Sequence, residues 1–143
     1  MGRAVKPLLV FKDSQAAGAG VLRTALAGRS EPFAADVTVG TRVPNSRSPE
    51  EQFRYVLVRK DGDAPHSSMA MSRVLLRVTV WHEDPDQAHD LAMLCQGLLV
   101  CHDGSVLSAV RPNGGPLPGT DPDSGVDLST FTVRVNVRAD VLA

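Results

Sequence analysis

The residues best suited to metal chemistry are three histidines and two cysteines between positions 82 and 102. A zinc site needs such side chains at close spacing, as in C-x-x-C or H-x-x-x-H, and neither pattern occurs here. The helix expected in this stretch separates its two ends by about 25 Å, so one ion cannot reach side chains at both. We therefore predict no metal site from His82, His89, Cys95, Cys101 and His102.

Three carboxylates and a glycine late in the chain resemble part of a calcium-binding loop. Asp121, Asp123, Gly125 and Asp127 stand at alternating positions. The bidentate glutamate that closes such a loop is missing, because the twelfth position is Thr132 in an expected strand. Asp side chains also build tight turns by hydrogen bonding to nearby backbone. Turn formation explains these residues without an ion, and we expect no cofactor.

Groups for nucleophilic or phosphate chemistry do not follow known catalytic patterns. No G-x-S-x-G elbow occurs, and neither cysteine stands at a helix start, where its pKa would fall. Asn113-Gly114-Gly115 lacks the lysine and the helix of a phosphate-binding loop. Glu83 and Asp84 are interpreted as charges at a helix N-terminus. We therefore predict that the protein is not an enzyme.

The length and the net charge limit the classes of function further. The 143 residues suit a single domain over 1–143, with residues 1–12 as an N-terminal arm. Fifteen basic and sixteen acidic residues give a formal charge of −1, so bulk charge gives no reason for tight nonspecific DNA binding. No apolar run approaches the roughly 20 residues of a membrane span. Basic residues around the first two expected strands form either a solvated surface or a contact with a partner or passing DNA: Arg42, Arg47, Arg54, Arg59 and Lys60.

The stretch from Ser72 to Cys101 predicts the centre of the fold, a strand followed by a tight turn and a helix. Apolar residues alternate with others up to Trp81, which is the period of a strand. Asp84 suits the N-cap of the helix and Pro85 its first position. One helical face is apolar and includes Ala88, Leu91, Ala92, Cys95, Leu98 and Leu99. The two cysteines on this helix cannot pair, which favours a reduced setting.

The first half of the chain predicts one helix and two strands. The short apolar run 8–11 either opens a helix or packs as an arm. A helix follows from Asp13 or Ser14 to Ala27, a strand from 36 to 43, a loop from 44 to 49 and a strand from 52 to 60. The strand 52–60 is apolar on both faces. It is therefore either central and covered, or buried by a neighbouring subunit.

The rest of the chain predicts a turn at 61–65, a short strand at 105–110 and a long strand at 128–138. The segment 111–126 holds four prolines and four glycines and is predicted to lack regular structure. The fold class is therefore α/β (α+β). We expect a mainly antiparallel sheet of about four to five strands packed against two helices.

These elements, in this order, resemble the tail terminator (tail-completion) proteins of long-tailed bacteriophages, especially those of actinobacterial hosts. The resemblance covers about residues 13 to 138. It lies in the phrase G-T-R-V-P at 40–44, in R-V-T-V-W at 77–81 with its following helix A-H-D-L-A at 88–92, and in D-P-D-S-G at 121–125 before the final strand.

The resemblance implies a homo-hexameric ring that caps the tail tube, ends its polymerisation and joins the tail to the head connector. Its partners would be copies of itself, the major tail tube protein and the head–tail connector or neck protein. DNA would pass through the lumen without sequence-specific binding, and no membrane would be involved. The protein would lie in the virion, at the head-proximal end of the tail, and in the host cytoplasm during assembly.

On this resemblance, the loops 44–49 and 111–125 are expected to contact neighbouring subunits or the tube, because loops shaped by proline and glycine often carry interfaces. Three arginines are candidates for ion pairs between subunits: Arg42, Arg47 and Arg59. The full set of candidate interface residues is Arg42, Asn45, Arg47, Tyr55, Arg59, Pro118, Asp121 and Asp123.

Two other functions remain open at this point. Another adaptor of the phage neck, such as a head-completion protein, would bind the portal side and leave tube length uncontrolled. A small ligand-binding or enzymatic α/β domain would need a pocket with convergent polar groups.

Overall fold

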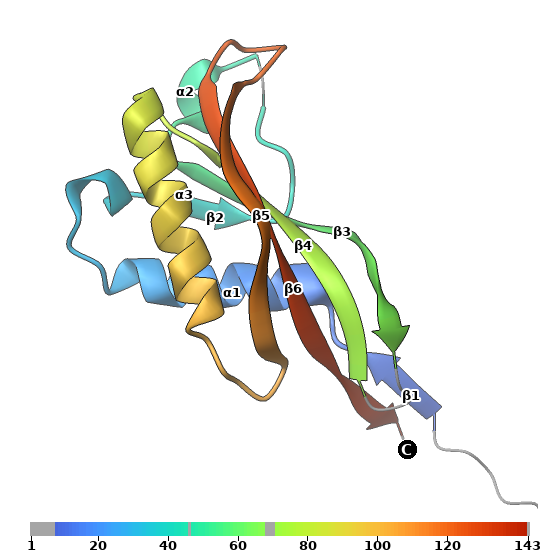
Figure 1. Cartoon of the computed structure of the whole chain (residues 1–143). Helices are drawn as coiled ribbons and strands as arrows, with labels where there is room; N and C mark the ends of the chain where they lie inside the picture. Colours follow the sequence, from blue (N-terminus) through green and yellow to red (C-terminus); the bar gives the residue numbers. More distant parts are fainter. Residues whose placement is uncertain (1–7, 46, 68–70, 143) are drawn as a thin grey trace, which may run out of the picture.

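A computed structural model describes residues 8–45, 47–67 and 71–142 as a mixed α+β fold with two layers. One layer is a mainly antiparallel sheet. Helices α1 (Ser14–Ala27) and α3 (Pro85–Val100) form the other layer and cover one face of that sheet (Figure 1). Within the described ranges, no helix is both long and apolar enough to span a bilayer.

The sheet is organised around β6, which pairs on both of its sides. Its order is β1-β6-β4-β3-β2, and β5 also pairs with β6. All neighbours are antiparallel except β2 and β3, which are parallel. The strands are β1 (Leu8–Phe11), β2 (Thr38–Gly40), β3 (Tyr55–Ser67), β4 (Met71–Trp81), β5 (Leu107–Thr120) and β6 (Asp127–Leu142).

The core lies between the helices and the inward rows of β3, β4 and β6. Alternate residues of β4 and β6 are almost completely buried, as their period of two predicts: Val74, Leu76, Val78, Val80, Phe131, Val133, Val135 and Val137. The apolar face of α3 is buried against them, although Leu98 is only partly covered. The central strand and helix predicted from the sequence are therefore confirmed.

Both long helices begin where the sequence indicates, because an aspartate caps each. The Asp13 carboxylate accepts hydrogen bonds from the backbone N–H groups of Gln15 (3.0 Å) and Ala16 (3.2 Å). Asp84 caps α3 in the same way, accepting from Asp86 (2.9 Å) and Gln87 (3.1 Å). These bonds satisfy backbone donors that have no partner within the helix.

The N-terminal prediction needs two corrections. The run 8–11 does not open a helix; it packs against the sheet as strand β1, paired with the C-terminal end of β6. The rest of the predicted arm, residues 1–7, lies outside the described residues. The strand expected at 36–43 is limited to Thr38–Gly40, because Asp36 has a positive φ of 55° and the backbone bends again at residues 41 and 42.

The strand expected at 52–60 is shifted toward the C-terminus. Pro49 opens a short helix, α2 (Pro49–Gln52), and Arg54 with φ 55° separates it from β3. Strand β3 then continues through the turn expected at 61–65, with an irregularity in its pairing with β4 between Lys60 and Gly62. In addition to the two predicted helices, the described residues form α2 and a short 3-10 helix, Pro32–Ala34.

Strand β3, predicted to be apolar on both faces, is central in the sheet, and both of its faces are covered by other parts of the same chain. Val56 and Val58 face the helices and are fully buried. On the opposite face, Leu57 is only 6% exposed, because it packs with Trp81 and Val126. A neighbouring subunit is not needed to bury this strand.

The segment predicted to lack regular structure is mostly strand. β5 runs through Leu107–Thr120 and takes up its prolines and glycines. Prolines are tolerated because β5 is an edge strand, paired only with β6, so a missing backbone N–H can face solvent. Its pairing shifts register at three places, which accommodates the special residues. β6 is also longer than the predicted 128–138, and the described sheet has six strands instead of four to five.

The packing of α1 generates a stability prediction for its glycines. A Cβ on Gly18 would lie 3.1 Å from Leu76 Cδ1 and 3.2 Å from Val58 Cγ1, whereas a Cβ on Gly20 would meet nothing within 4 Å. We expect Gly20→Ala to raise the free energy of unfolding by about 0.5 to 1 kcal/mol through helix propensity. Gly18→Ala should be less stable than Gly20→Ala, because the packed side chains of Leu76 and Val58 must shift to admit the new methyl group. Urea denaturation of both variants checks this; equal gains would contradict the close approach.

Candidate functional site

The candidate loop residue Asp121 forms the centre of a buried hydrogen-bond network. Its Oδ2 accepts from Gln52 Nε2 and from Trp81 Nε1, both at 3.1 Å. Its Oδ1 accepts from the backbone N–H groups of Asp123 (2.9 Å) and Ser124 (3.3 Å). The Ser124 hydroxyl in turn donates to Gln52 Oε1. The network joins α2, the end of β4 and the turn between β5 and β6.

The electrostatics of Asp121 favour its charged form. Its side chain is largely buried, and burial acts to raise the pKa of its carboxyl. The hydrogen bonds from Asp123, Trp81, Ser124 and Gln52 outweigh that effect and hold the pKa below its ordinary value. A carboxylate with this many donors is a turn-forming anchor. Of the residues that resemble part of a calcium loop, Asp121 therefore bonds within the chain and shapes the turn.

Tyr55, which packs against Trp81 of this network, holds the G-T-R-V-P segment at 40–44 in place. Its hydroxyl donates to the carbonyl of Arg42 at 2.7 Å, and its ring packs edge-on against Trp81 with centroids 6.1 Å apart. Gly40 is required here, because a Cβ would collide with the Tyr55 hydroxyl. The Arg59 guanidinium donates to the Thr41 carbonyl at 3.2 Å and holds the same segment.

The remaining candidate residues lie on the surface. Arg42, Asn45, Arg47, Pro118 and Asp123 are exposed. The side-chain oxygen Oδ1 of Asn45 accepts from the Arg47 backbone N–H at 3.0 Å, which shapes the loop. In the part of the chain that the structure describes, the side chains of Arg42 and Arg47 form no ion pair. Their pairing with a neighbouring subunit stays a prediction.

The structure brings together only some of the eight candidates. Tyr55 and Asp121 both contact Trp81. Each would contribute to a subunit contact indirectly, by fixing the loop that makes it. Arg54, one of the basic residues noted beside them, is structural. It donates to Glu83 at 2.9 Å and to the carbonyls of Pro32 and Ala35. The basic residues around the first strands are therefore partly used within the chain.

Sequence reasoning missed a cluster of arginines on the uncovered face of the sheet, which we call the arginine face: Arg73, Arg111 and Arg134. They line a hollow of about 230 Å³ together with Asn136 and Ala109. Arg134 stands directly opposite Arg111 in the β5–β6 ladder, and Arg73 stands opposite Asn136 in the β4–β6 ladder. The only available signal was the polar row of the last strand, which includes Arg134.

None of these three guanidinium groups forms a hydrogen bond or ion pair with the described residues. The nearby Arg77 differs, because it makes a two-pronged contact with Asp61 at 3.0 and 3.1 Å. That contact lowers the pKa of the Asp61 carboxyl and raises that of Arg77, mainly through the side-chain hydrogen bond. The arginine face thus carries uncompensated positive charge.

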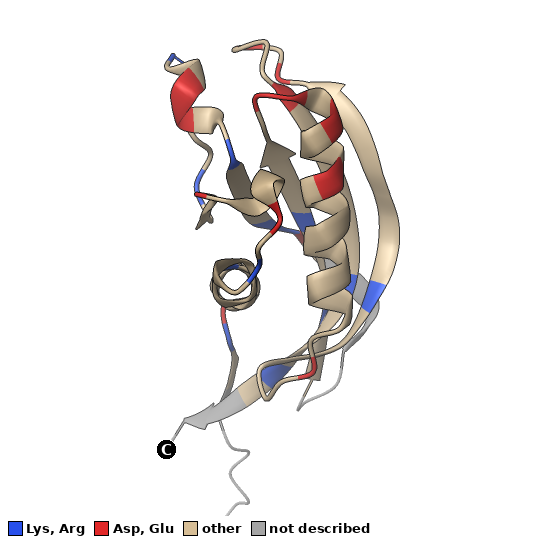
Figure 2. Ribbon diagram, turned by 90° about the vertical axis from the view of Figure 1, so that its left-hand side faces the viewer, with Lys and Arg blue, Asp and Glu red and all other residues tan. Residues whose placement is uncertain are grey.

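Negative charge gathers at one end of the molecule, which we call the acidic end: Glu50, Glu51, Asp86 and Asp123. These four exposed residues come from α2, the first turn of α3 and the β5–β6 turn. The bonds of Asp121 to Gln52 and Trp81 hold these segments side by side. In Figure 2, most of the red ribbon that marks Asp and Glu lies in the upper part of the molecule.

His82 is a buried titratable group just before α3. It is 0% exposed, and its Nδ1 accepts from the Asp84 backbone N–H at 3.2 Å. Its Nε2 has no hydrogen-bond partner among the described residues. Burial lowers the pKa of this imidazole below its ordinary value, although the Glu83 carboxylate partly opposes the shift. His82 is therefore neutral near pH 7.

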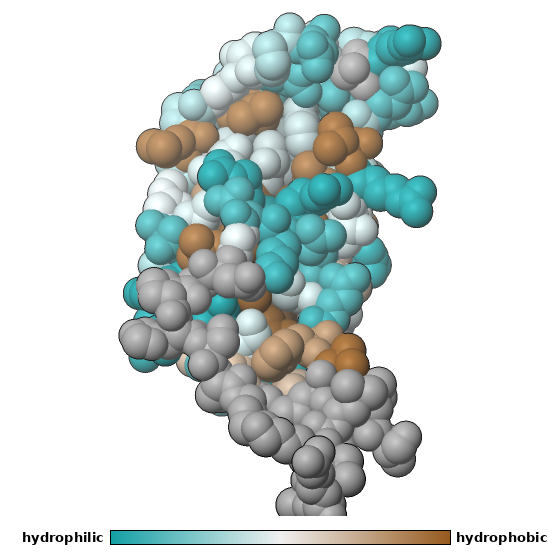
Figure 3. All heavy atoms as spheres, turned by 90° about the vertical axis from the view of Figure 1, so that its right-hand side faces the viewer, coloured by the Kyte–Doolittle hydropathy of each residue, from teal (hydrophilic) through white to brown (hydrophobic). Residues whose placement is uncertain are grey.

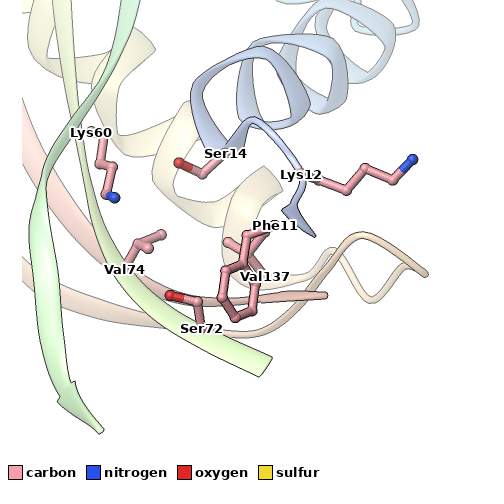
Figure 4. Close-up of a pocket in the computed structure, with 7 residues that line it drawn as sticks. All are labelled: Phe11, Lys12, Ser14, Lys60, Ser72, Val74 and Val137. Atoms are coloured by element: carbon pink, nitrogen blue, oxygen red, sulfur yellow. The ribbon is translucent and has the colours of Figure 1, made fainter. Parts of the chain in front are cut away.

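A cavity that could be considered for a small ligand lies at the other end of the fold. It has a volume of about 310 Å³ and lies between the end of β1, the start of α1 and strands β3, β4 and β6. Figure 4 shows Phe11, Val74 and Val137 on its walls, with the hydroxyl of Ser14 pointing inward and Lys12 pointing away. It contains none of the candidate interface residues.

Comparison of the chain with models of protein families and with curated proteins finds no match. Among the described residues, no group of three or more His, Cys, Asp or Glu side chains is arranged to hold a metal ion. Cys95 is buried, which raises the pKa of its thiol to about 12, and Cys101 is exposed; both are free thiols. Function is therefore inferred from the geometry of the two charged surfaces and the loops between them.

Removing the Asp121 carboxylate should destabilise the fold strongly. Asp121→Ala leaves the Trp81 and Gln52 donors buried without a partner, so we expect the free energy of unfolding to fall by about 2 to 4 kcal/mol. Asp123→Ala is the matched control, because Asp123 is exposed and its loss should change stability by about 0.5 kcal/mol or less. Chemical denaturation compares the two; similar values would show that the network is not an anchor.

Burial of His82 should make the protein less stable in mild acid. Because its pKa is lowered on folding, the unfolded chain binds a proton that the folded chain excludes. Stability is full above the unfolded pKa of about 6.5 and falls as the pH drops toward the lower folded pKa. We expect His82→Gln to remove the fall in thermal midpoint between about pH 7 and 5, while His89→Gln retains it. The idea fails if the wild-type midpoint is flat across this range.

Proposed function

We propose that this protein is a tail terminator of a long-tailed bacteriophage. It forms a ring of identical copies that caps the tail tube, ends tube polymerisation and joins the tail to the head connector. DNA passes through the lumen of this ring without sequence-specific binding. Support comes from the sequence phrases at 40–44, 77–92 and 121–125, together with the α+β fold in which they are embedded.

The observation that carries the proposal is the separation of charge over a sheet that is covered on one face only. Helices α1 and α3 lie on the same face, so the outward rows of β4 and β6 face solvent (Figure 1). Arg73 of β4 and Arg134 of β6 form the arginine face with Arg111 of the neighbouring β5, and the acidic end lies elsewhere on the molecule. A small protein with two complementary surfaces is suited to assembly with copies of itself.

The loops expected to mediate contacts are compatible with this role. The exposed loop after β2 contains Arg42, Asn45 and Arg47, and Tyr55 fixes its start through the Arg42 carbonyl. The edge of β5 presents Pro118, which is exposed, and the turn after it is fixed by Asp121. Loops held this firmly present a defined shape to the tube or to a neighbouring subunit, which lowers the entropic cost of binding.

The mass of the assembled protein tests this proposal. At high protein concentration, sedimentation should give a species of six copies of 15.2 kDa, about 91 kDa, and electron microscopy should show closed rings. Tail tubes incubated with the protein should carry it at one end and stop growing. Protein that stays a monomer at every concentration and leaves tube growth unchanged would exclude the proposal. A neck adaptor would instead form rings that bind the portal and leave tube length uncontrolled.

A further inference from the structure

Among the described residues, the arginine face has no counter-ion. Arg111 and Arg134 stand directly opposite each other, and like charges at such a position destabilise a ladder. No described carboxylate bonds to either of them or to Arg73. Guanidinium groups bind carboxylates through parallel hydrogen bonds. A group of acidic side chains from outside the chain would therefore relieve the repulsion.

The acidic end cannot supply those carboxylates within the same molecule. Arg134 lies seven residues along β6 from Asp127, a separation of roughly 23 Å of strand, and Asp123 of the acidic end lies in the turn that precedes Asp127. An ion pair needs contact at about 4 Å. Arg54, the basic residue beside this end, is already bonded to Glu83 and to two carbonyl groups. Glu50 and Glu51 of α2 are exposed.

We infer that the arginine face of one subunit binds the acidic end of the next. This inference rests on the proposed ring and names the surfaces that close it. The two surfaces are different patches of one chain, so the contact is head-to-tail, and every copy offers one surface of each kind. Closure into a circle matches each arginine face with an acidic end. The arginine face carries three guanidinium groups and the acidic end four carboxylates, so the charges of the two surfaces nearly balance.

Apolar side chains accompany the charges on both surfaces. Leu117 of β5 is 69% exposed and lines a second hollow beside Arg77, and Phe53 directly after α2 is 38% exposed. Figure 3 shows the side of the molecule away from the helices, with hydrophilic side chains gathered across its middle and hydrophobic patches beside them. Stable interfaces combine an apolar centre with a polar rim. DNA phosphates would neutralise the arginines but would leave these apolar groups and the acidic end unmatched, so a second copy fits better.

A charge-exchange experiment tests the contact. The first variant is Arg111→Glu with Arg134→Glu, and the second is Glu50→Lys with Glu51→Lys. Each alone places like charges against one another, so we expect association at least tenfold weaker than wild type. An equimolar mixture should regain the wild-type assembly, because in an alternating ring every junction is again complementary. Sedimentation velocity at low ionic strength measures all four samples.

Circular dichroism of each variant establishes that it is folded, and Arg29→Glu is the charge-matched control. Arg29 is exposed and pairs with Glu31, outside both surfaces, so this control should assemble like wild type. A mixture that stays dissociated while wild type forms rings would overturn the inferred contact and leave the proposed ring standing. Wild-type protein that never assembles would overturn both.

Binding of a double-stranded DNA oligonucleotide tests whether the arginine face binds DNA instead of a second subunit. If the contact is between subunits, the Arg111→Glu, Arg134→Glu variant loses assembly. If that variant assembles like wild type and loses only its DNA affinity, the arginine face binds phosphates and the inference is wrong.

Discussion

Strands β4 and β6 can bury only one of their two rows of side chains, and this constraint shapes the whole molecule. Their inward valines, leucines and Phe131 are covered by α1 and α3. The cover is close, since a Cβ on Gly18 would press on Leu76 and Val58. Apart from Trp81, which packs with Leu57 and Val126, the outward row of β4 is left partly or fully exposed, for solvent or for another molecule. The helices thus cover one face of the sheet and leave the opposite face, which we call the open face, without a covering layer. Arg73, Arg111 and Arg134 come together on the open face.

The hydrogen-bond network of Asp121 keeps the two charged surfaces in a fixed position relative to each other. Asp121 binds the β5–β6 turn, α2 and the end of β4 into one unit, and Trp81 connects that unit to Tyr55. Glu50, Glu51 and Asp123 are carried on these same segments, and Asp86 lies in the first turn of α3, shortly after Trp81. Because a buried carboxylate with several donors is costly to disrupt, the end of the molecule that presents them is held rigidly. Rigid surfaces lose little entropy on binding, which favours assembly through a few charged contacts.

The sequence predicts the elements whose signals are local and misses those set by pairing across the sheet. Aspartate caps and apolar periodicity located α1, α3 and the middle of β6. The proline-rich segment was wrongly expected to be irregular, because only the topology reveals that β5 is an edge strand where proline is tolerated. The arginine face escaped notice for the same reason: Arg73, Arg111 and Arg134 lie far apart in sequence and meet only through the register of β6. Asp121 was selected as a loop residue, and its burial by Gln52 and Trp81 was not foreseeable from turn composition.

The account depends on the open face of the sheet becoming covered when copies assemble. Modification of arginine by a dicarbonyl reagent, followed by mass spectrometry, measures this directly at single residues. Rings compared with dilute subunits should show Arg111 and Arg134 protected, while Arg29, which is exposed at the far end of α1, reacts equally in both. If Arg111 and Arg134 react as fast in the assembled protein as in the free subunit, the open face is not the surface through which this protein assembles.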